Sequence, residues 1–209
     1  MKKAKRFLLL IICGILLIPV VNSCKIGDED SDFTIYSRKY RLCQNWSFSY
    51  YKHVVQHNDT IVTNEYDGSS YITVIGNKVY ISSATMRISF NTNGTYVWDE
   101  YIANDTSVYT YKEEGYWYFT GGGSDTETQY KELLALQKIK STQTMQIAGV
   151  TTTNTYEGSG TLQTTIYRLI KLAIDEVKME SRVEKQYIQG DQTILDIVTT
   201  EINLTMGAN

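Results

Sequence analysis

The sequence predicts an all-β, mainly antiparallel domain, and three observations support this prediction. From Tyr40 onward the chain is rich in Tyr, Thr, Val and Ile, which are residues that favour strands. The sequence has no proline after Pro19. Since proline within a sheet is confined to edges and bulges, this absence is compatible with many paired strands. Short strand-forming runs alternate with turn signals such as Gly76-Asn77 and Asn93-Gly94. Many short strands with regular turns are typical of an antiparallel sandwich or barrel.

The first predicted strand covers residues 42–50, where apolar and polar side chains alternate. Its apolar face consists of Leu42, Trp46, Phe48 and Tyr50. Two more strands, residues 70–75 and 78–82, are joined by Gly76-Asn77, which is a two-residue hairpin signal.

The middle of the chain predicts two further strand pairs. Residues 85–90 and 95–101 are joined through Asn93-Gly94, because both residues tolerate positive φ. Residues 107–112 and 116–120 are expected to meet at a turn around Glu113-Glu114-Gly115. The loop at residues 121–124 then precedes a strand at residues 130–139.

Residues 161–189 permit two interpretations. Their apolar residues recur at helical spacing, yet many of the same residues also share a period-two face. The segment is therefore either a helix or a strand pair with Asp175-Glu176 at its turn. Residues 193–204 contain β-branched residues throughout and predict a closing strand.

The N-terminal 23 residues have the pattern of a secretory signal. Basic residues at positions 2–6 precede an apolar run from Phe7 to Val21, and Cys24 follows a short polar step. This run is shorter than the ~20 apolar residues that span a bilayer. Cys24 resembles the lipobox cysteine of bacterial lipoproteins, although Val21 stands where Leu is usual. The resemblance implies lipid attachment at Cys24, with acyl chains such as palmitate. The alternatives are an uncleaved anchor and ordinary secretion.

Residues 24–39 are predicted to be an acidic, flexible tether. Four acidic residues lie within nine positions of Cys24, and such a composition cannot bury enough apolar surface to fold alone. The stretch resembles the export signal of some Gram-negative lipoproteins. We therefore expect a lipid-anchored protein of the outer membrane that faces the cell exterior. A plain linker, and the inner leaflet, remain the alternatives.

The charge balance excludes one class of partner. Residues 1–23 hold four of the twenty basic residues and none of the 23 acidic ones, so the remaining 186 residues carry a net charge of −7. Such a surface repels nucleic acid and anionic headgroups. Membrane attachment is therefore expected through acyl chains on Cys24.

Turn residues and aromatic side chains recur in a fixed order along residues 40–209. Trp46 is followed by ISFNTNGTY (88–96), GYW (115–117), LAL (134–136) and IYRLIKL (166–172). This order resembles the lipocalin-like domain of Gram-negative outer-membrane lipoproteins. Residues 53–83 and 151–155 depart from the pattern. The resemblance implies an up-and-down β-barrel, or a strongly curved sheet, with room for one small ligand.

No thiol or histidine motif predicts catalysis or metal binding. Cys43 lies in an alternating stretch and is expected to be a small buried side chain. His53 and His57 are four residues apart and have Asp59 nearby, but they lack the glutamate of a zinc-protease helix. A solvated histidine pair is expected rather than a metal site. We predict no metal and no cofactor.

Acidic pairs occur at residues 99–100, 113–114 and 175–176. Glycosidases need two carboxyl groups across a substrate, whereas adjacent carboxylates at turns are ordinarily solvated. We expect these pairs to be solvated and the protein to have no enzymatic activity.

Aromatic residues concentrate between residues 96 and 119. Buried Tyr and Trp need partners for their polar tips, so some of these rings should face a wet cavity. Trp98, Trp117, Tyr96 and Phe119 are expected to point to one side and border a pocket near the 121–124 loop. Alternatively, one set fills the barrel and the other coats it. The candidate ligand-binding residues are Trp98, Tyr101, Tyr109, Tyr111 and Trp117.

Two functions follow from these features. The favoured one is a non-catalytic, lipid-anchored surface lipoprotein that acts as a binding or interaction module for a glycan or a small amphipathic ligand. The alternative is a structural envelope lipoprotein that docks onto an outer-membrane protein and has no small-molecule site. The sequence does not determine the ligand, the partner or the oligomeric state.

Overall fold

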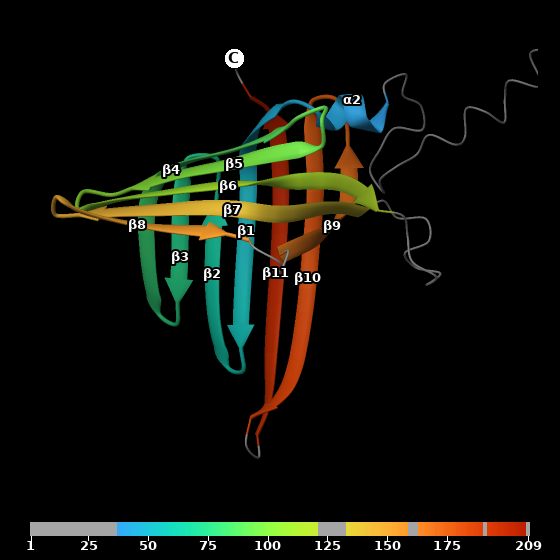
Figure 1. Cartoon of the computed structure of the whole chain (residues 1–209). Coiled ribbons are helices and arrows are strands. Elements are labelled where there is room, and N and C mark those ends of the chain that lie inside the picture. The colour runs from blue at the N-terminus through green and yellow to red at the C-terminus, as the bar shows by residue number, and fades with distance from the viewer. Residues whose placement is uncertain (1–36, 121–132, 159–162, 190–191, 208–209) are drawn as a thin grey trace, which may run out of the picture.

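The computed structural model describes residues 37–120, 133–158, 163–189 and 192–207. Within these ranges one sheet of eleven antiparallel strands closes into a ten-strand barrel, so the all-β barrel prediction is confirmed (Figure 1). The segment predicted to be a signal peptide, the predicted lipid-attachment residue Cys24 and the predicted loop at residues 121–124 lie outside the described residues. No helix in the described ranges is long and apolar enough to cross a membrane.

One short helix and eleven strands make up the described chain. They are α2 (Arg38–Leu42), β1 (Asn45–His57), β2 (Thr60–Tyr66), β3 (Ser70–Ile75), β4 (Lys78–Phe90), β5 (Thr95–Ala103), β6 (Ser107–Thr120), β7 (Leu133–Ile147), β8 (Val150–Glu157), β9 (Gln163–Leu172), β10 (Glu176–Gln189) and β11 (Gln192–Met206). The segment that permitted a helix or a strand pair is therefore the strand pair β9–β10.

The barrel is narrower at one end because β1 and β4 pair directly there. Trp46 lies opposite Ile88, and this contact closes a ring of eight strands that bypasses β2 and β3. Farther along, the β2–β3 hairpin is inserted between β1 and β4 and raises the number to ten. Because barrel diameter grows with strand number, this end is wider. The insertion lies within residues 53–83, the first segment that departs from the lipocalin-like pattern.

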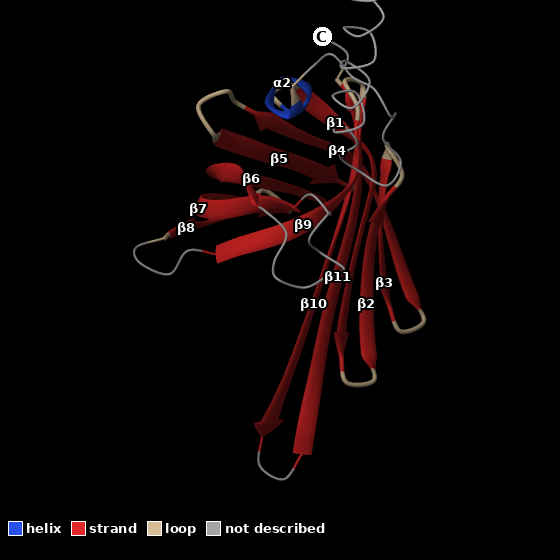
Figure 2. Ribbon diagram, turned by 90° about the vertical axis from the view of Figure 1, so that its right-hand side faces the viewer, coloured by secondary structure: helices blue, strands red, loops and turns tan. Residues whose placement is uncertain are grey.

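The second departing segment, residues 151–155, lies in β8, and here the barrel wall opens. β6 pairs with β7 along its whole length, so β8 and β9 share the other edge of β7. β10 pairs with β9 only from Val177 to Glu180 and then continues beside β11 alone. The wall therefore separates between β8 and the far part of β10. Figure 2 shows strands β5 to β9 diverging from the long strands β10, β11, β2 and β3.

Two hairpin turns agree with the sequence prediction. Gly76-Asn77 separates β3 from β4, and Asn93-Gly94 lies between β4 and β5. Gly94 has a φ of +86°, a conformation that glycine adopts without steric cost. Phe90 pairs with Tyr96 across this turn, as expected.

The turn predicted at Glu113-Glu114-Gly115 is wrong, because β6 runs through these residues without a break. A Cβ atom at Gly115 would lie 2.1 Å from the carbonyl oxygen of Gln137 and 2.6 Å from the ring of Tyr96. Glycine is therefore required here for the close approach of β7 and the Tyr96 ring, not for a turn.

The alternation predicted for the first strand is also partly wrong. Leu42 belongs to α2, and β1 begins at Asn45. The register of β1 against β11 shifts between Phe48 and Tyr50. Since a bulge adds one residue to a strand, the inward face passes from Phe48 to Tyr51 instead of Tyr50. The rings of Phe48 and Tyr51 pack edge to face with centroids 6.1 Å apart.

The barrel interior is apolar at the narrow end and polar toward the wide end. Near the narrow end Trp46, Ile88 and Leu204 are almost completely buried. The helix α2 lies across this end, where Leu42 joins the core and its carbonyl accepts a 2.8 Å hydrogen bond from Trp46 Nε1 (Figure 1).

Three adjacent strands make the change from apolar to polar at the same level. From the narrow end toward the wide end, the next inward residue after Met179 in β10 is Ser181. In the same direction, Thr200 comes after Ile202 in β11, and His53 comes after Tyr51 in β1. The register places the second residue of each pair in one row across the three strands. The polar interior is therefore a continuous layer rather than a set of isolated residues.

Candidate functional site

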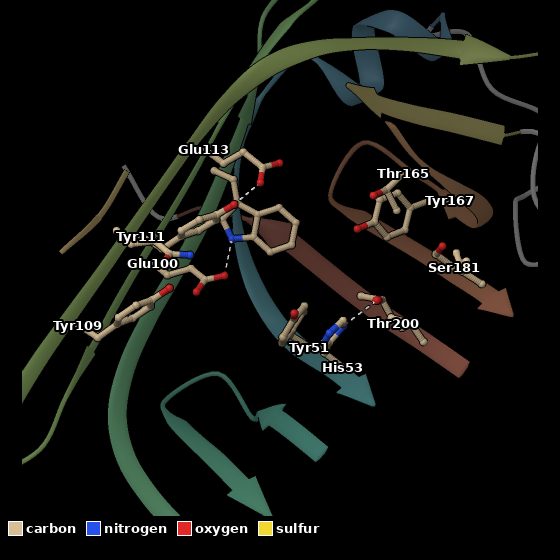
Figure 3. A pocket seen from close by; sticks show the side chains of 14 residues that line it. Tyr51, His53, Glu100, Tyr109, Tyr111, Glu113, Thr165, Tyr167, Ser181 and Thr200 are labelled. Carbon is tan, nitrogen blue, oxygen red and sulfur yellow. Dashed lines mark hydrogen bonds between the residues drawn. The ribbon is translucent and has the colours of Figure 1, made fainter. Parts of the chain in front are cut away.

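A pocket of about 460 Å³ lies inside the barrel where the wall opens. Seven strands contribute the 14 side chains that line it, and Figure 3 shows most of them converging on one space. The lining combines aromatic rings, two carboxyl groups, one imidazole and several hydroxyl groups. No lysine or arginine occurs among these described lining residues.

One wall of the pocket is the β5–β6 hairpin. Its register sets Trp98 opposite Glu113 and Glu100 opposite Tyr111. Since alternate residues of a strand share a face, these four side chains all point inward. This arrangement contradicts the prediction that Glu100 and Glu113 are solvated carboxylates at turns, because both lie within strands and face the interior.

Glu113 is held by several partners. The hydroxyl group of Tyr96 donates a 2.6 Å hydrogen bond to one carboxylate oxygen, and the hydroxyl group of Tyr111 donates to the other. Lys138 Nζ lies 3.8 Å from Glu113 as well. These contacts fix the orientation of Glu113 and compensate its charge.

Glu100 has far fewer partners. It accepts one hydrogen bond, 2.9 Å long, from Trp98 Nε1, and forms no salt bridge with any described residue. Burial raises the pKa of Glu100 to about 7, the nearby Glu113 charge adds to this rise, and the bond from Trp98 opposes it. A carboxyl group with this pKa exchanges its proton near neutral pH.

The tyrosines and the histidine of the pocket are neutral near pH 7. Burial raises the pKa of Tyr109 to about 12, and burial also raises the pKa values of Tyr51, Tyr111 and Tyr167. Burial lowers the pKa of His53, whose Nδ1 lies 3.0 Å from the Thr200 hydroxyl oxygen. The pocket therefore offers hydroxyl groups, a neutral imidazole and negative charge.

The structure separates the five predicted ligand-binding residues. Trp98, Tyr109 and Tyr111 line the pocket. Trp117 is only 6% exposed and packs edge to face on Phe90 in the core. Tyr101 is 49% exposed because it falls on the outer face of β5.

The four rings expected to point to one side do share the interior. Tyr96, Trp98 and Trp117 are core residues, and Phe119 packs against them. The pocket, however, lies near Trp98 and Glu100, not at the end of β6 that leads to residues 121–124.

The remaining candidates are not assembled into a reactive site. Burial raises the pKa of the Cys43 thiol, which disfavours the nucleophilic thiolate. His57 Nδ1 lies 2.6 Å from Asp196 in a solvent-exposed pair at the end of β1. Within the described ranges, no three His, Cys, Asp or Glu residues are grouped as a metal would require.

Sequence reasoning missed 11 of the 14 lining residues, and three of these supply the carboxyl and imidazole groups: Glu100, Glu113 and His53. Two of them carried a usable signal: Glu100 continues the inward series of Tyr96 and Trp98, and Glu113 follows Tyr109 and Tyr111 at the same spacing. A carboxylate inside an inward aromatic series indicates a polar interior. His53 carried no such signal, because the bulge in β1 decides its direction.

No family model, curated protein or solved structure matches this chain.

Proposed function

We propose that this protein is a lipid-anchored outer-membrane lipoprotein whose lipocalin-like barrel binds a small amphipathic ligand without catalysing a reaction. The observation that carries this proposal is the polar and aromatic pocket inside the barrel. Its volume of about 460 Å³ falls within the range of ligand pockets in proteins.

The composition of the pocket supports binding over simple packing. A barrel that serves only as a scaffold can fill its interior with apolar side chains, as this chain does near Trp46 and Leu204. At the next level the interior instead presents His53, Thr200 and Ser181. His53 and Thr200 pair with each other, and this polar layer borders an open space. Polar side chains placed there, instead of apolar filling, favour a ligand that they can contact.

The anchor supports a position at the membrane surface. The Cys24 motif resembles a lipobox, and the acidic residues after it resemble an export signal. A barrel on such a tether would meet small molecules outside the cell, which is consistent with a binding role.

Mass spectrometry of native protein tests the proposal directly. The full chain would be purified from membranes in mild detergent, and bound small molecules would be released and identified. The variant Ser181→Trp, which places a large ring in the pocket, should lose the bound molecules. Tyr101→Trp adds the same ring on the outer face and serves as the matched control. Equal recovery from wild type and Ser181→Trp would contradict binding in this pocket.

A second function, docking onto an outer-membrane protein, is favoured by one part of β4. Residues 78–82 pair with β3 only, so their other edge is open. Val79, Tyr80 and Ile81 are 59%, 52% and 66% exposed, which leaves apolar side chains in solvent on both faces of an open edge. Such an edge can pair with an extended strand of a partner that carries alternating apolar side chains.

The double substitution Val79→Lys and Ile81→Lys separates the two functions. If the protein docks through this edge, the double variant extracted from membranes should run on native gels as free protein and not as a complex. Ligand binding alone predicts an unchanged gel and an unchanged set of bound small molecules.

A further inference from the structure

The described lining of the pocket carries carboxyl groups but no lysine or arginine, which gives the pocket a negative electrostatic character. Its two ionisable carboxyl groups are not matched by any lysine or arginine among the described lining residues. Lys138 lies close to Glu113 and compensates only that carboxylate. Glu100 therefore remains the one lining carboxyl group without a cationic neighbour in the part of the chain that the structure describes.

Aromatic side chains surround this carboxyl group. Trp98 donates its indole N–H to Glu100 and packs edge to face against Tyr51, with ring centroids 6.0 Å apart. Figure 3 shows Tyr109 beside the Glu100 carboxyl group on the neighbouring strand. These rings offer apolar surface next to the carboxyl group, where the hydrocarbon part of a ligand can pack.

We propose that the pocket binds a small organic amine, with the ammonium group at the Glu100 carboxylate and the apolar part of the ligand against Trp98, Tyr51 and Tyr109. An ammonium group supplies the positive charge that Glu100 lacks beside it. Its N–H groups can also donate hydrogen bonds to the carboxylate oxygens of Glu100. An anionic ligand would meet two carboxyl groups and, among the described lining residues, no lysine or arginine. This inference rests on the proposed binding function and adds the chemical class of the ligand.

The affinity for an amine should depend on pH through Glu100. The titratable groups that face it are Tyr51 and His53 from β1, Tyr71 from β3, Tyr109, Tyr111 and Glu113 from β6, and Tyr167 from β9. Burial raises the tyrosine pKa values and lowers that of His53, whereas the pKa of Glu100 is about 7. A protonated Glu100 cannot neutralise an ammonium group. Binding should therefore weaken roughly 30-fold between about pH 8 and about pH 5.5.

Isothermal titration calorimetry with two matched probes tests the inference. The full chain in detergent would be titrated with 2-phenylethylamine and with 2-phenylethanol, which has a similar shape and no charge. We expect the amine to bind at least tenfold more tightly than the alcohol at about pH 8. Glu100→Gln should remove this preference and the pH dependence. Asp99→Asn, on the outer face of the same strand, should retain both.

The outcomes separate this inference from the proposed function. Equal affinity for the two probes, or a preference that survives in Glu100→Gln, overturns the amine assignment and leaves a pocket for neutral ligands. Absence of binding by both probes, together with no small molecule recovered from native protein, overturns the binding function as well. Preference for the amine that disappears in Glu100→Gln and persists in Asp99→Asn supports both.

Discussion

Replacing Glu100 with glutamine should stabilise the folded protein at alkaline pH. The glutamine side chain has nearly the same shape, and its carbonyl oxygen can accept the hydrogen bond from Trp98 Nε1. The substitution removes the negative charge of Glu100, which has no cationic partner among the residues that the structure describes. A functional carboxylate held in an unfavourable environment lowers stability, and its neutralisation recovers that free energy.

The size and sign of the effect follow from the pKa of Glu100. In the folded protein this pKa is about 7, above the ordinary value of 4.5 expected in the unfolded chain. The unfolded chain therefore loses its proton first as pH rises, and stability falls between about pH 4.5 and about pH 7 and is constant above. At pH 8 the cost is about 3 kcal/mol, and near pH 5 it is below about 1 kcal/mol.

Urea unfolding followed by tryptophan fluorescence, at several pH values, measures this difference. Subtracting the wild-type free energy of unfolding from that of Glu100→Gln isolates Glu100, because the titration of His53 is common to both proteins. Asp99→Asn should behave as wild type throughout. A Glu100→Gln variant that is no more stable than wild type at pH 8, or whose advantage does not vary with pH, would refute the reasoning.

Three further predictions concern the core and the anchor. Gly115→Ala should lower the free energy of unfolding by about 2–3 kcal/mol, because its methyl group meets the Gln137 carbonyl oxygen. Gly158→Ala, whose nearest contacts lie at 3.5 Å, should be neutral and is the control. Urea titration compares the two variants, and equal stabilities would contradict the packing account. Trp117→Ala should cost about 3–5 kcal/mol in thermal melts, and a near-native melting temperature would remove Trp117 from the core. Cys24→Ala should leave an unlipidated precursor in detergent partitioning, and a mature-size species in the detergent phase would rule out the lipoprotein assignment.

Much of the barrel was predictable because its signals are local. A two-residue turn such as Asn93-Gly94 depends on the φ angles of its own residues, and alternation along β5 depends on strand geometry. These signals were sufficient for the strand content, the hairpins and the inward direction of Trp98. They failed at Gly115, where a glycine that usually marks a turn instead provides space for the neighbouring strand.

The sequence by itself determined that the chain forms antiparallel strands and that Tyr96, Trp98 and Trp117 share one side. Only the tertiary structure decided where the interior becomes a pocket. The bulge after Phe48 turns His53 inward, and the departure of β10 from β9 opens the wall beside Glu100. The bulge depends on how β1 aligns with β11, more than 150 residues away in the chain, as Tyr51 does with Ile202. The opening depends on where β10 stops pairing with β9 and continues beside β11 alone. Alternation shows which residues share a face, but pairing across the barrel decides which of them meet and which face an open space.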